Sequence, residues 1–257
     1  MLISFLFLLI YFAIFKRSEI KKIKSNLPFT ALIAGAMLSF NYYGFMKGVE
    51  YTGAGNAQIM IQLGPTLLIM SGLIIFKEHF SFKQVIGILL ALIGFTLFYY
   101  DQRKFDLDST LNVGNLWIIG AAITWAIYAS LQKRLISKWD PQTLNLIIYC
   151  VCAVILFFLC DFRQSLDFTF NQWVLMIFLG LNTVIAYGCF AESLKLAPAS
   201  EVSLIITINP LGTLMLLWLG QFLEISWMPV EYITWIGGLG ALCVVFGVGW
   251  TLTRKKS

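Results

Sequence analysis

The chain has 257 residues, of which 59% are hydrophobic and 12% are charged, and its formal net charge is +5. Soluble domains carry roughly 25% charged residues, so this composition excludes a soluble globular protein and indicates an integral membrane protein. The sequence has one histidine and five cysteines without a CxxC spacing, and it contains neither a GxGxxG nor a P-loop motif. We therefore expect no enzymatic centre, no metal site, no cofactor and no nucleic-acid partner.

Nine apolar stretches follow one another along the chain, each near the length that crosses a bilayer as a helix. A membrane helix needs about 20 apolar residues, and the stretches are continuous rather than alternating, which favours helices over barrel strands. The predicted spans are 1–15, 29–47, 56–76, 84–100, 114–132, 143–160, 172–191, 202–220 and 232–251. The sequence therefore predicts an all-α integral membrane protein with about nine transmembrane helices.

Lys and Arg residues divide unequally between the two sides of these predicted spans. Four of the 18 fall on one side, namely Lys47, Arg103, Lys104 and Arg163, and all the others fall on the opposite side. Positively charged loops stay in the cytoplasm. The distribution predicts that the N-terminus lies outside and the C-terminus in the cytoplasm, in a bacterial inner (plasma) membrane.

The third predicted span carries amides and a proline inside an apolar run. Residues 56–70 read NAQIMIQLGPTLLIM, with Gln58, Gln62 and Pro65 in the interior. Proline removes a hydrogen bond to the fourth residue before it, which frees the carbonyl of Ile61. Such a break is costly in lipid but tolerated against other helices or a water-filled cavity. We expect a kink at Pro65.

A similar pattern recurs around Pro210, where we expect a second kink. When Pro65 is aligned with Pro210, several pairs match, namely Tyr42 with Tyr187, Phe45 with Phe190, Ala54 with Ala199 and, after a one-residue gap, Glu78 with Glu224. The segments 87–94 (GILLALIG) and 240–247 (GALCVVFG) also share glycines seven residues apart. The two copies have opposite orientations in the predicted topology. Inverted repeats with interrupted helices are typical of secondary transporters.

The order of these segments resembles the EamA-type branch of the drug/metabolite transporter superfamily. The matching pieces are residues 46–81, 120–134 and 193–226. Both 46–81 and 193–226 combine a loop of small residues, a proline-bearing helix and a Glu near the helix end. The resemblance implies ten helices in two inverted five-helix repeats around a central cavity. On this chain the repeats would be an N-terminal repeat, 1–105, and a C-terminal repeat, 112–253.

The N-terminal repeat has four predicted spans where the family has five. The stretch 1–15 covers about 22 Å as a helix at 1.5 Å per residue, which is short of the roughly 30 Å hydrocarbon core. We therefore expect that the first helix of the family fold is missing from this chain. Either a longer form exists, or nine helices suffice and lipid or another protomer fills the gap. A homodimer is therefore one of the open alternatives.

Mid-span polar and aromatic residues are the candidates to line a central substrate cavity. They are Asn41, Tyr42, Gln58, Gln62, Trp125, Tyr128, Tyr187, Ser203 and Thr207. Gln58 and Gln62 are four residues apart and share a helix face, as do Ser203 and Thr207. The alternative is that these side chains bond to or pack on neighbouring helices, as polar residues do in membrane bundles.

Three glutamates lie at the ends of predicted spans. Glu192 closes an apolar helix, and ionisable groups in spans are functional candidates, which makes it a candidate coupling carboxylate. The alternative is a solvated pair with Lys195. Glu78 and Glu224 are interpreted as interfacial anchors.

These features predict a transporter, and specifically an exporter, of small organic metabolites, amino acids or drugs. It would work by alternating access between the two repeats without ATP hydrolysis. The scarcity of charges in mid-span argues against a strongly anionic substrate. The alternatives are a membrane-embedded lipid-modifying enzyme and a scaffold or subunit that transports nothing.

Overall fold

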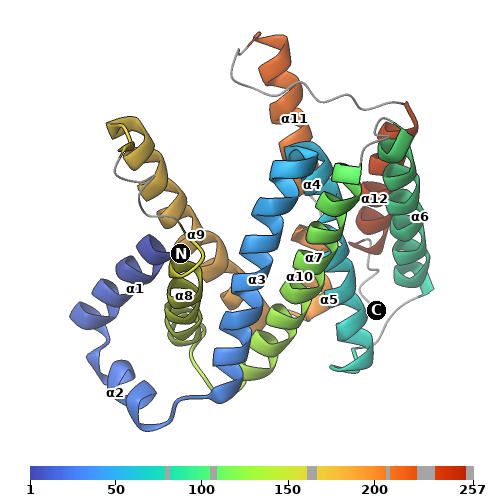
Figure 1. Cartoon of the computed structure of the whole chain (residues 1–257). Coiled ribbons are helices and arrows are strands. Elements are labelled where there is room, and N and C mark those ends of the chain that lie inside the picture. Colours follow the sequence, from blue (N-terminus) through green and yellow to red (C-terminus); the bar gives the residue numbers. More distant parts are fainter. Residues whose placement is uncertain (79–81, 105–108, 161–166, 207–208, 225–234, 253–257) are drawn as a thin grey trace. The chain divides into compact units, whose positions relative to one another are not determined.

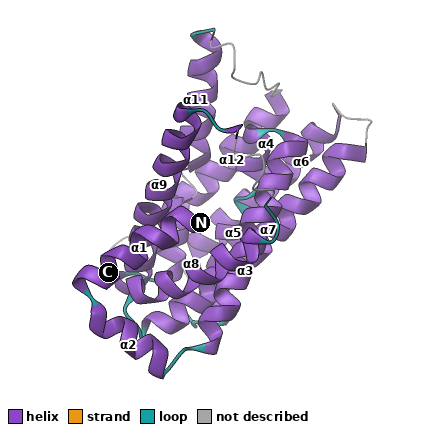
Figure 2. Ribbon diagram, turned by 60° about the vertical axis from the view of Figure 1, so that its left-hand side comes forward, coloured by secondary structure: helices purple, strands orange, loops and turns teal. Residues whose placement is uncertain are grey.

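The computed structural model describes the chain except residues 79–81, 105–108, 161–166, 207–208, 225–234 and 253–257. The described residues form twelve α-helices and contain no strand (Figures 1 and 2). In chain order the helices are α1 (Leu2–Phe15), α2 (Arg17–Ser25), α3 (Phe29–Thr52), α4 (Ala54–Met60), α5 (Leu63–Ile74), α6 (Phe82–Lys104), α7 (Ser109–Ile136), α8 (Pro141–Phe157), α9 (Phe170–Leu196), α10 (Ala199–Ile206), α11 (Asn209–Phe222) and α12 (Trp235–Leu252). The predicted all-α architecture is confirmed.

Each predicted span overlaps at least one of these helices. Three helical stretches of the described residues are long and apolar enough to cross a membrane, namely Ala54–Ile74, Val113–Ile136 and Phe170–Leu196. Shorter apolar helices are Leu2–Phe15, Val85–Gly94, Pro141–Phe157 and Trp235–Gly247. The count of nine transmembrane helices stays a prediction.

The chain divides into two compact units. The first unit comprises residues 1–40 and 127–197, and the second unit comprises residues 41–126 and 198–257. Each unit takes helices from both predicted repeats, so the units cut across the sequence repeats. The repeat boundaries themselves stay a prediction.

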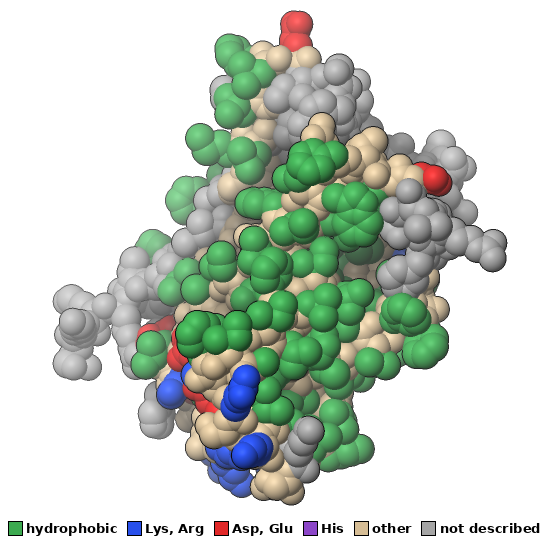
Figure 3. All heavy atoms as spheres, turned by 90° about the vertical axis from the view of Figure 1, so that its left-hand side faces the viewer, with side chains coloured by type: hydrophobic (Ala, Val, Ile, Leu, Met, Phe, Trp, Pro, Cys, Tyr) green, Lys and Arg blue, Asp and Glu red, His purple; other side chains and the backbone are tan. Residues whose placement is uncertain are grey.

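In the first unit, α1 packs against α8 and α9. The approach to α9 is close because Gly180 has no side chain: a Cβ atom there would lie 2.5 Å from Cγ2 of Ile3. Small residues permit such contacts between membrane helices. Apart from Gly180, the stretch 171–182 of α9 is exposed and mostly apolar. Figure 3 shows hydrophobic side chains exposed over much of the described part of the face that it draws, which suits a lipid environment.

In the second unit, α6 and α12 lie side by side (Figure 1). A Cβ atom on Gly94 would lie 2.6 Å from the carbonyl oxygen of Gly240, and one on Gly247 would lie 2.6 Å from that of Gly87. The glycines that repeat seven residues apart in the sequence are therefore the contact surface between these two helices. Their spacing, two helical turns, keeps both glycines of each helix on one face.

Candidate functional site

The helix that carries Pro65 is interrupted four residues before the proline. α4 ends at Met60 and α5 begins at Leu63, with a turn at Ile61 and Gln62 between them. Pro65 has no N–H group to donate to the Ile61 carbonyl. That carbonyl instead accepts a hydrogen bond from the Gly64 N–H at 2.9 Å, a tighter i to i+3 contact. The interruption places Gln62 at the N-cap position of α5.

Gln62 is buried and half of its amide has no partner. Its side chain is 2% exposed, and its Nε2 donates to the Gln58 carbonyl at 3.3 Å. Among the described residues, Oε1 of Gln62 is buried and accepts no hydrogen bond. Gln58 itself is half-buried. The interrupted helix therefore holds an unsatisfied acceptor inside the protein.

Ser203, which aligns with Gln58 when Pro65 is aligned with Pro210, is buried on α10. It is 0% exposed, and its Oγ has no hydrogen-bond partner within the described part of the chain. α10 packs against α5 in the second unit. Thr207, the predicted neighbour of Ser203 on the same face, lies outside the described residues, as does the side chain of Pro210. The interruption between α4 and α5 and the helix α10 thus each carry a buried, unpaired polar atom.

Asn41 and Trp125 contact neighbouring helices of the second unit. Asn41, which is 6% exposed, donates from Nδ2 to the Ala121 carbonyl of α7 at 2.9 Å. Trp125 lies against the break in α4–α5, because a Cβ on Gly64 would be 3.1 Å from its Cε3 atom. Tyr42 is half-buried on α3. The Asn41 contact favours helix packing over solute contact at that position.

The pair Asn56 and Asn115 joins α4 to α7 and was not among the predicted site residues. Nδ2 of Asn56 donates to Oδ1 of Asn115 at 2.9 Å, and both residues are buried. Oδ1 of Asn56 is buried without a partner among the described residues. The available signal was an isolated Asn in each of two apolar runs, since such residues in lipid seek a partner.

In the first unit, Tyr128 and Tyr187 belong to an aromatic cluster. The ring of Tyr128 is fully buried and its centroid lies 5.9 Å from that of Tyr187 and 6.3 Å from that of Phe190. Beside it, Gln132 Nε2 donates to Asn145 Oδ1 at 2.7 Å, and Asn145 Nδ2 donates to the Tyr187 carbonyl at 3.2 Å. This chain of amides ties α7, α8 and α9 together.

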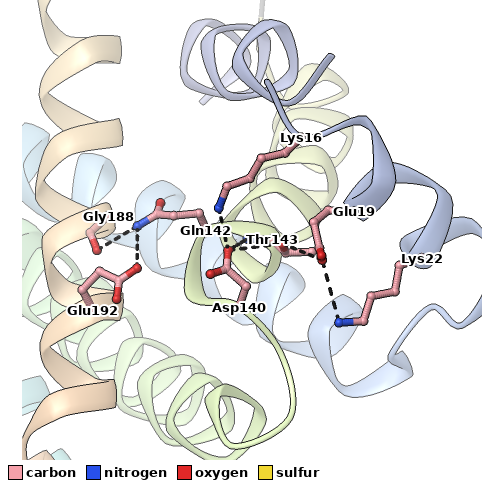
Figure 4. Close-up of polar contacts among 8 residues, drawn as sticks. All are labelled: Lys16, Glu19, Lys22, Asp140, Gln142, Thr143, Gly188 and Glu192. Atoms are coloured by element: carbon pink, nitrogen blue, oxygen red, sulfur yellow. Dashed lines mark hydrogen bonds and ion pairs between the residues drawn. The ribbon is translucent and has the colours of Figure 1, made fainter. Parts of the chain in front are cut away.

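Glu192 lies in a polar network around the start of α8 (Figure 4). Gln142 Nε2 points to Oε1 of Glu192 at 3.4 Å and to the Gly188 carbonyl at 3.3 Å. Asp140 caps α8 by accepting from the Thr143 N–H at 3.2 Å, and it also pairs with Lys16 at 3.7 Å. Glu192 therefore contacts an amide rather than a basic side chain in the described part of the network.

Two further sets of polar contacts lie at the end of α9 and at the start of α10, one in each unit. Nζ of Lys133 donates to the Leu194 and Ala197 carbonyls at 2.6 Å each. In the second unit, Oε1 of Glu78 accepts from the Ala199 N–H at 2.8 Å, and Oε2 accepts from the Ser200 N–H at 3.2 Å and from its hydroxyl at 2.6 Å. Sequence reasoning took Glu78 for an interfacial anchor and missed these contacts, because the partner lies more than 100 residues away.

The predicted site residues thus divide between the two units. Those described in the second unit are Asn41, Tyr42, Gln58, Gln62, Pro65, Trp125 and Ser203, and those in the first are Tyr128, Tyr187 and Glu192. Within the described residues, no group of three or more His, Cys, Asp or Glu side chains could hold a metal ion. The chemistry on offer is hydrogen bonding inside an apolar bundle, which suits a membrane transporter.

Comparison with known proteins gives the family. The EamA-like transporter family model matches residues 1–100 and 112–253, and the chain belongs to this family. An uncharacterized transporter of Haemophilus influenzae is 32% identical over 219 residues, which cover 84% of this chain and 71% of the relative. An uncharacterized inner membrane transporter of Escherichia coli K12, YhbE, is 30% identical over 84% of this chain and 68% of its own length.

More distant proteins resemble this chain in sequence or in fold. The uncharacterized transporter YyaM of Bacillus subtilis is 26% identical over 95% of this chain and 78% of its own length. One crystal structure superimposes with a TM-score of 0.60 at 13% identity, over 88% of this chain and 77% of that one. The likeness to that structure concerns the fold alone. The protein is an integral membrane transporter of the EamA-like family.

Proposed function

We propose that this transporter exports a small, modestly polar organic solute, such as an amino acid, a metabolite or a drug, across the bacterial inner membrane. It works by alternating access between two inverted repeats and uses no ATP. The observation that carries the proposal is the pair of buried, unpaired polar atoms, Oε1 of Gln62 and Oγ of Ser203. They lie on the two helices that the sequence pairs through Pro65 and Pro210.

An unsatisfied buried acceptor is costly. Leaving a buried polar group without a partner costs about 1–3 kcal/mol, and lipid cannot supply the missing hydrogen bond. A solute that donates to Gln62 Oε1 and bonds to the Ser203 hydroxyl recovers that free energy when it binds. The neutral amide and hydroxyl suit a neutral or zwitterionic solute rather than a strongly anionic one.

Export also requires a defined orientation of the chain in the membrane. The excess of Lys and Arg on one side of the predicted spans supports a cytoplasmic C-terminus. Export would then take solute from the side of α2, whose exposed basic residues include Arg17, Lys21 and Lys22. A reporter enzyme that is active only in the cytoplasm, fused after Ser257, tests this orientation.

Transport by purified protein in liposomes tests the proposal. A panel of labelled amino acids, metabolites and drugs is loaded, and flux is compared with that of empty liposomes. Ser203→Ala should weaken transport affinity about two- to tenfold, the equivalent of one net hydrogen bond of about 0.5–1.5 kcal/mol. Ser39→Ala is the matched control, because Ser39 is equally buried but its hydroxyl already donates to the Gly35 carbonyl at 2.8 Å.

The outcomes separate the competing functions. Flux above that of empty liposomes, lowered by Ser203→Ala and not by Ser39→Ala, supports transport through this site. Flux equal to that of empty liposomes for the whole panel contradicts it. The appearance of modified lipid in the liposomes, measured by mass spectrometry, would favour a lipid-modifying enzyme instead.

A further inference from the structure

Glu78 joins the end of α5 to the start of α10. It follows α5, and its carboxylate accepts hydrogen bonds from the Ala199 N–H, the Ser200 N–H and the Ser200 hydroxyl of α10. A helix begins with unpaired N–H groups and a partial positive charge. The carboxylate therefore satisfies the start of α10, the helix that carries Ser203.

The backbone around Glu78 and the glycine at position 72 position this carboxylate. Lys77 adopts a left-handed backbone conformation with φ of 52°, and the Glu78 N–H donates to the Gly72 carbonyl at 2.9 Å. A Cβ atom on Gly72 would lie 2.7 Å from Oε2 of Glu78. Gly72 thus leaves the space that the docked carboxylate occupies.

The contact is one that can open. Glu78 is half-buried, and no Lys or Arg pairs with it among the described residues. Its partners are two backbone N–H groups and one hydroxyl, so undocking moves the carboxylate into water without separating a buried ion pair.

The matching glutamate of the C-terminal repeat is in a different state. Glu224, which aligns with Glu78, also lies where the backbone turns left-handed, with its own φ at 52°. Its side chain is exposed and makes no hydrogen bond or ion pair within the described part of the chain. One of two equivalent carboxylates is docked and the other is not, and an alternating-access cycle would produce such a difference.

We propose that Glu78 is a releasable latch that positions α10, and with it Ser203, during the transport cycle. Docked, it holds the start of α10 against the end of α5. Released, it is as exposed as Glu224 is here, and α10 moves with respect to α5. This inference rests on the proposed transport function, and Glu78 is a positioning residue because it acts through α10 rather than on the solute.

Hydrogen–deuterium exchange of the full chain in lipid nanodiscs tests the latch without any solute. In Glu78→Gln, the amides of the first turn of α10 should exchange roughly ten- to hundredfold faster, because the charge-assisted hydrogen bonds are lost. Gly72→Ala should have a similar effect by displacing the carboxylate. Glu224→Gln is the matched control and should leave the exchange of α10 unchanged. If Glu78→Gln does not reach the membrane, Ser200→Ala removes a single contact and should loosen α10 by a smaller factor.

Transport kinetics form the second arm. Glu78→Gln should change the turnover of a solute from the panel at least threefold while its half-saturation concentration stays within about twofold. Unchanged exchange at α10, or equal loosening by Glu224→Gln, contradicts the latch. Loosened exchange with wild-type turnover also overturns it, because Glu78 would then be a static clamp. A wild-type protein that moves no solute contradicts the proposed function alone, since the exchange arm is measured without solute.

Discussion

Two membrane-length helical stretches of this protein treat their polar groups in opposite ways. In Ala54–Ile74, which comprises α4 and α5, 56% of the apolar window is buried, whereas in Phe170–Leu196, which is α9, the figure is 17%. The more buried stretch is interrupted and contains unpaired side-chain oxygen atoms. The more exposed stretch is continuous, and side chains of other helices bond to its backbone.

The contacts of α9 are those of a helix held in place by hydrogen bonds. Side chains of α1, α7 and α8 donate to five of its carbonyls. The pairs are Ser4 to Gly180, Tyr149 to Thr183, Asn145 to Tyr187, Gln142 to Gly188 and Lys133 to Leu194. These donors are satisfied, so they stabilise the first unit and offer nothing to a solute.

In α4–α5, by contrast, buried side-chain oxygen atoms lack hydrogen-bond partners among the described residues. Oε1 of Gln62 and Oδ1 of Asn56 are buried without partners among the described residues. Since unpaired buried groups lower stability, a protein keeps them where they are used. In this comparison the hydrogen-bonded side chains around α9 act as a scaffold, and the unpaired atoms of α4–α5 are candidates for the site. Oγ of Ser130 and Oε1 of Gln132, in the first unit, are also buried without a partner among the described residues.

The largest effect is expected at the scaffold. Asn145→Leu removes the acceptor of Gln132 and the donor to the Tyr187 carbonyl, and it leaves the Gln132 amide buried at 0% exposure. We expect a loss of about 1–3 kcal/mol in the free energy of unfolding, measured by denaturation in mixed micelles. A variant as stable as wild type would show that the amide chain does not hold α9.

Gln62→Leu should lower the transport affinity and leave the free energy of unfolding nearly unchanged. It removes an unpaired acceptor and one long hydrogen bond to the Gln58 carbonyl, at 3.3 Å. We expect stability to change by less than about 0.5 kcal/mol while transport affinity falls about two- to tenfold. Liposome flux and micelle denaturation measure the two quantities on one preparation. Destabilisation equal to that of Asn145→Leu would erase the distinction between the two regions.

The sequence predicted local backbone features better than contacts between helices. The position of Pro65 predicted that the Ile61 carbonyl would lose its usual helical partner, and that carbonyl accepts from the Gly64 N–H instead. The glycine spacing in 87–94 and 240–247 was interpreted only as a sign of the repeat, and in the structure these glycines lie between α6 and α12. Both follow from local chemistry, because proline lacks an N–H and glycine lacks a Cβ.

Partners across the fold were not predictable in the same way. Asn41 and Gln62 are both amides in apolar runs, yet one bonds to the Ala121 carbonyl and the other keeps an unpaired oxygen. A polar residue in a membrane helix shows that a partner is needed, but tertiary packing selects the partner. The same holds for Glu78, whose contacts lie on α10.

A smaller effect is expected for Pro65→Ala. The substitution restores an N–H that can reach the Ile61 carbonyl, which now accepts from Gly64. We expect a straighter α4–α5 and a severalfold slower turnover with little change in half-saturation, since the interruption serves the change of shape rather than binding. Turnover as fast as wild type would remove the hinge role. Stopped-flow transport in liposomes measures it.

The smallest effect is expected on the exposed side of α9. Ile185 is 64% exposed, so Ile185→Val should alter neither stability nor transport beyond about 0.5 kcal/mol or twofold, as for other surface substitutions. A larger effect would mean that this side of α9 contacts another protein rather than lipid. Denaturation and flux assays on the same preparation provide the measurement.

The central claim is that the unpaired polar atoms of Gln62 and Ser203 bind the solute, while the hydrogen-bonded side chains of Asn145 and Ser39 do not. Its most direct test is the dissociation constant of a transported solute, obtained from the stabilisation that the solute gives each variant. The account predicts a constant about two- to tenfold higher in Gln62→Leu and Ser203→Ala. It predicts the wild-type constant in Asn145→Leu and Ser39→Ala, each referred to its own stability without solute. Equal constants in all four variants, or a weaker constant in Asn145→Leu alone, would contradict it.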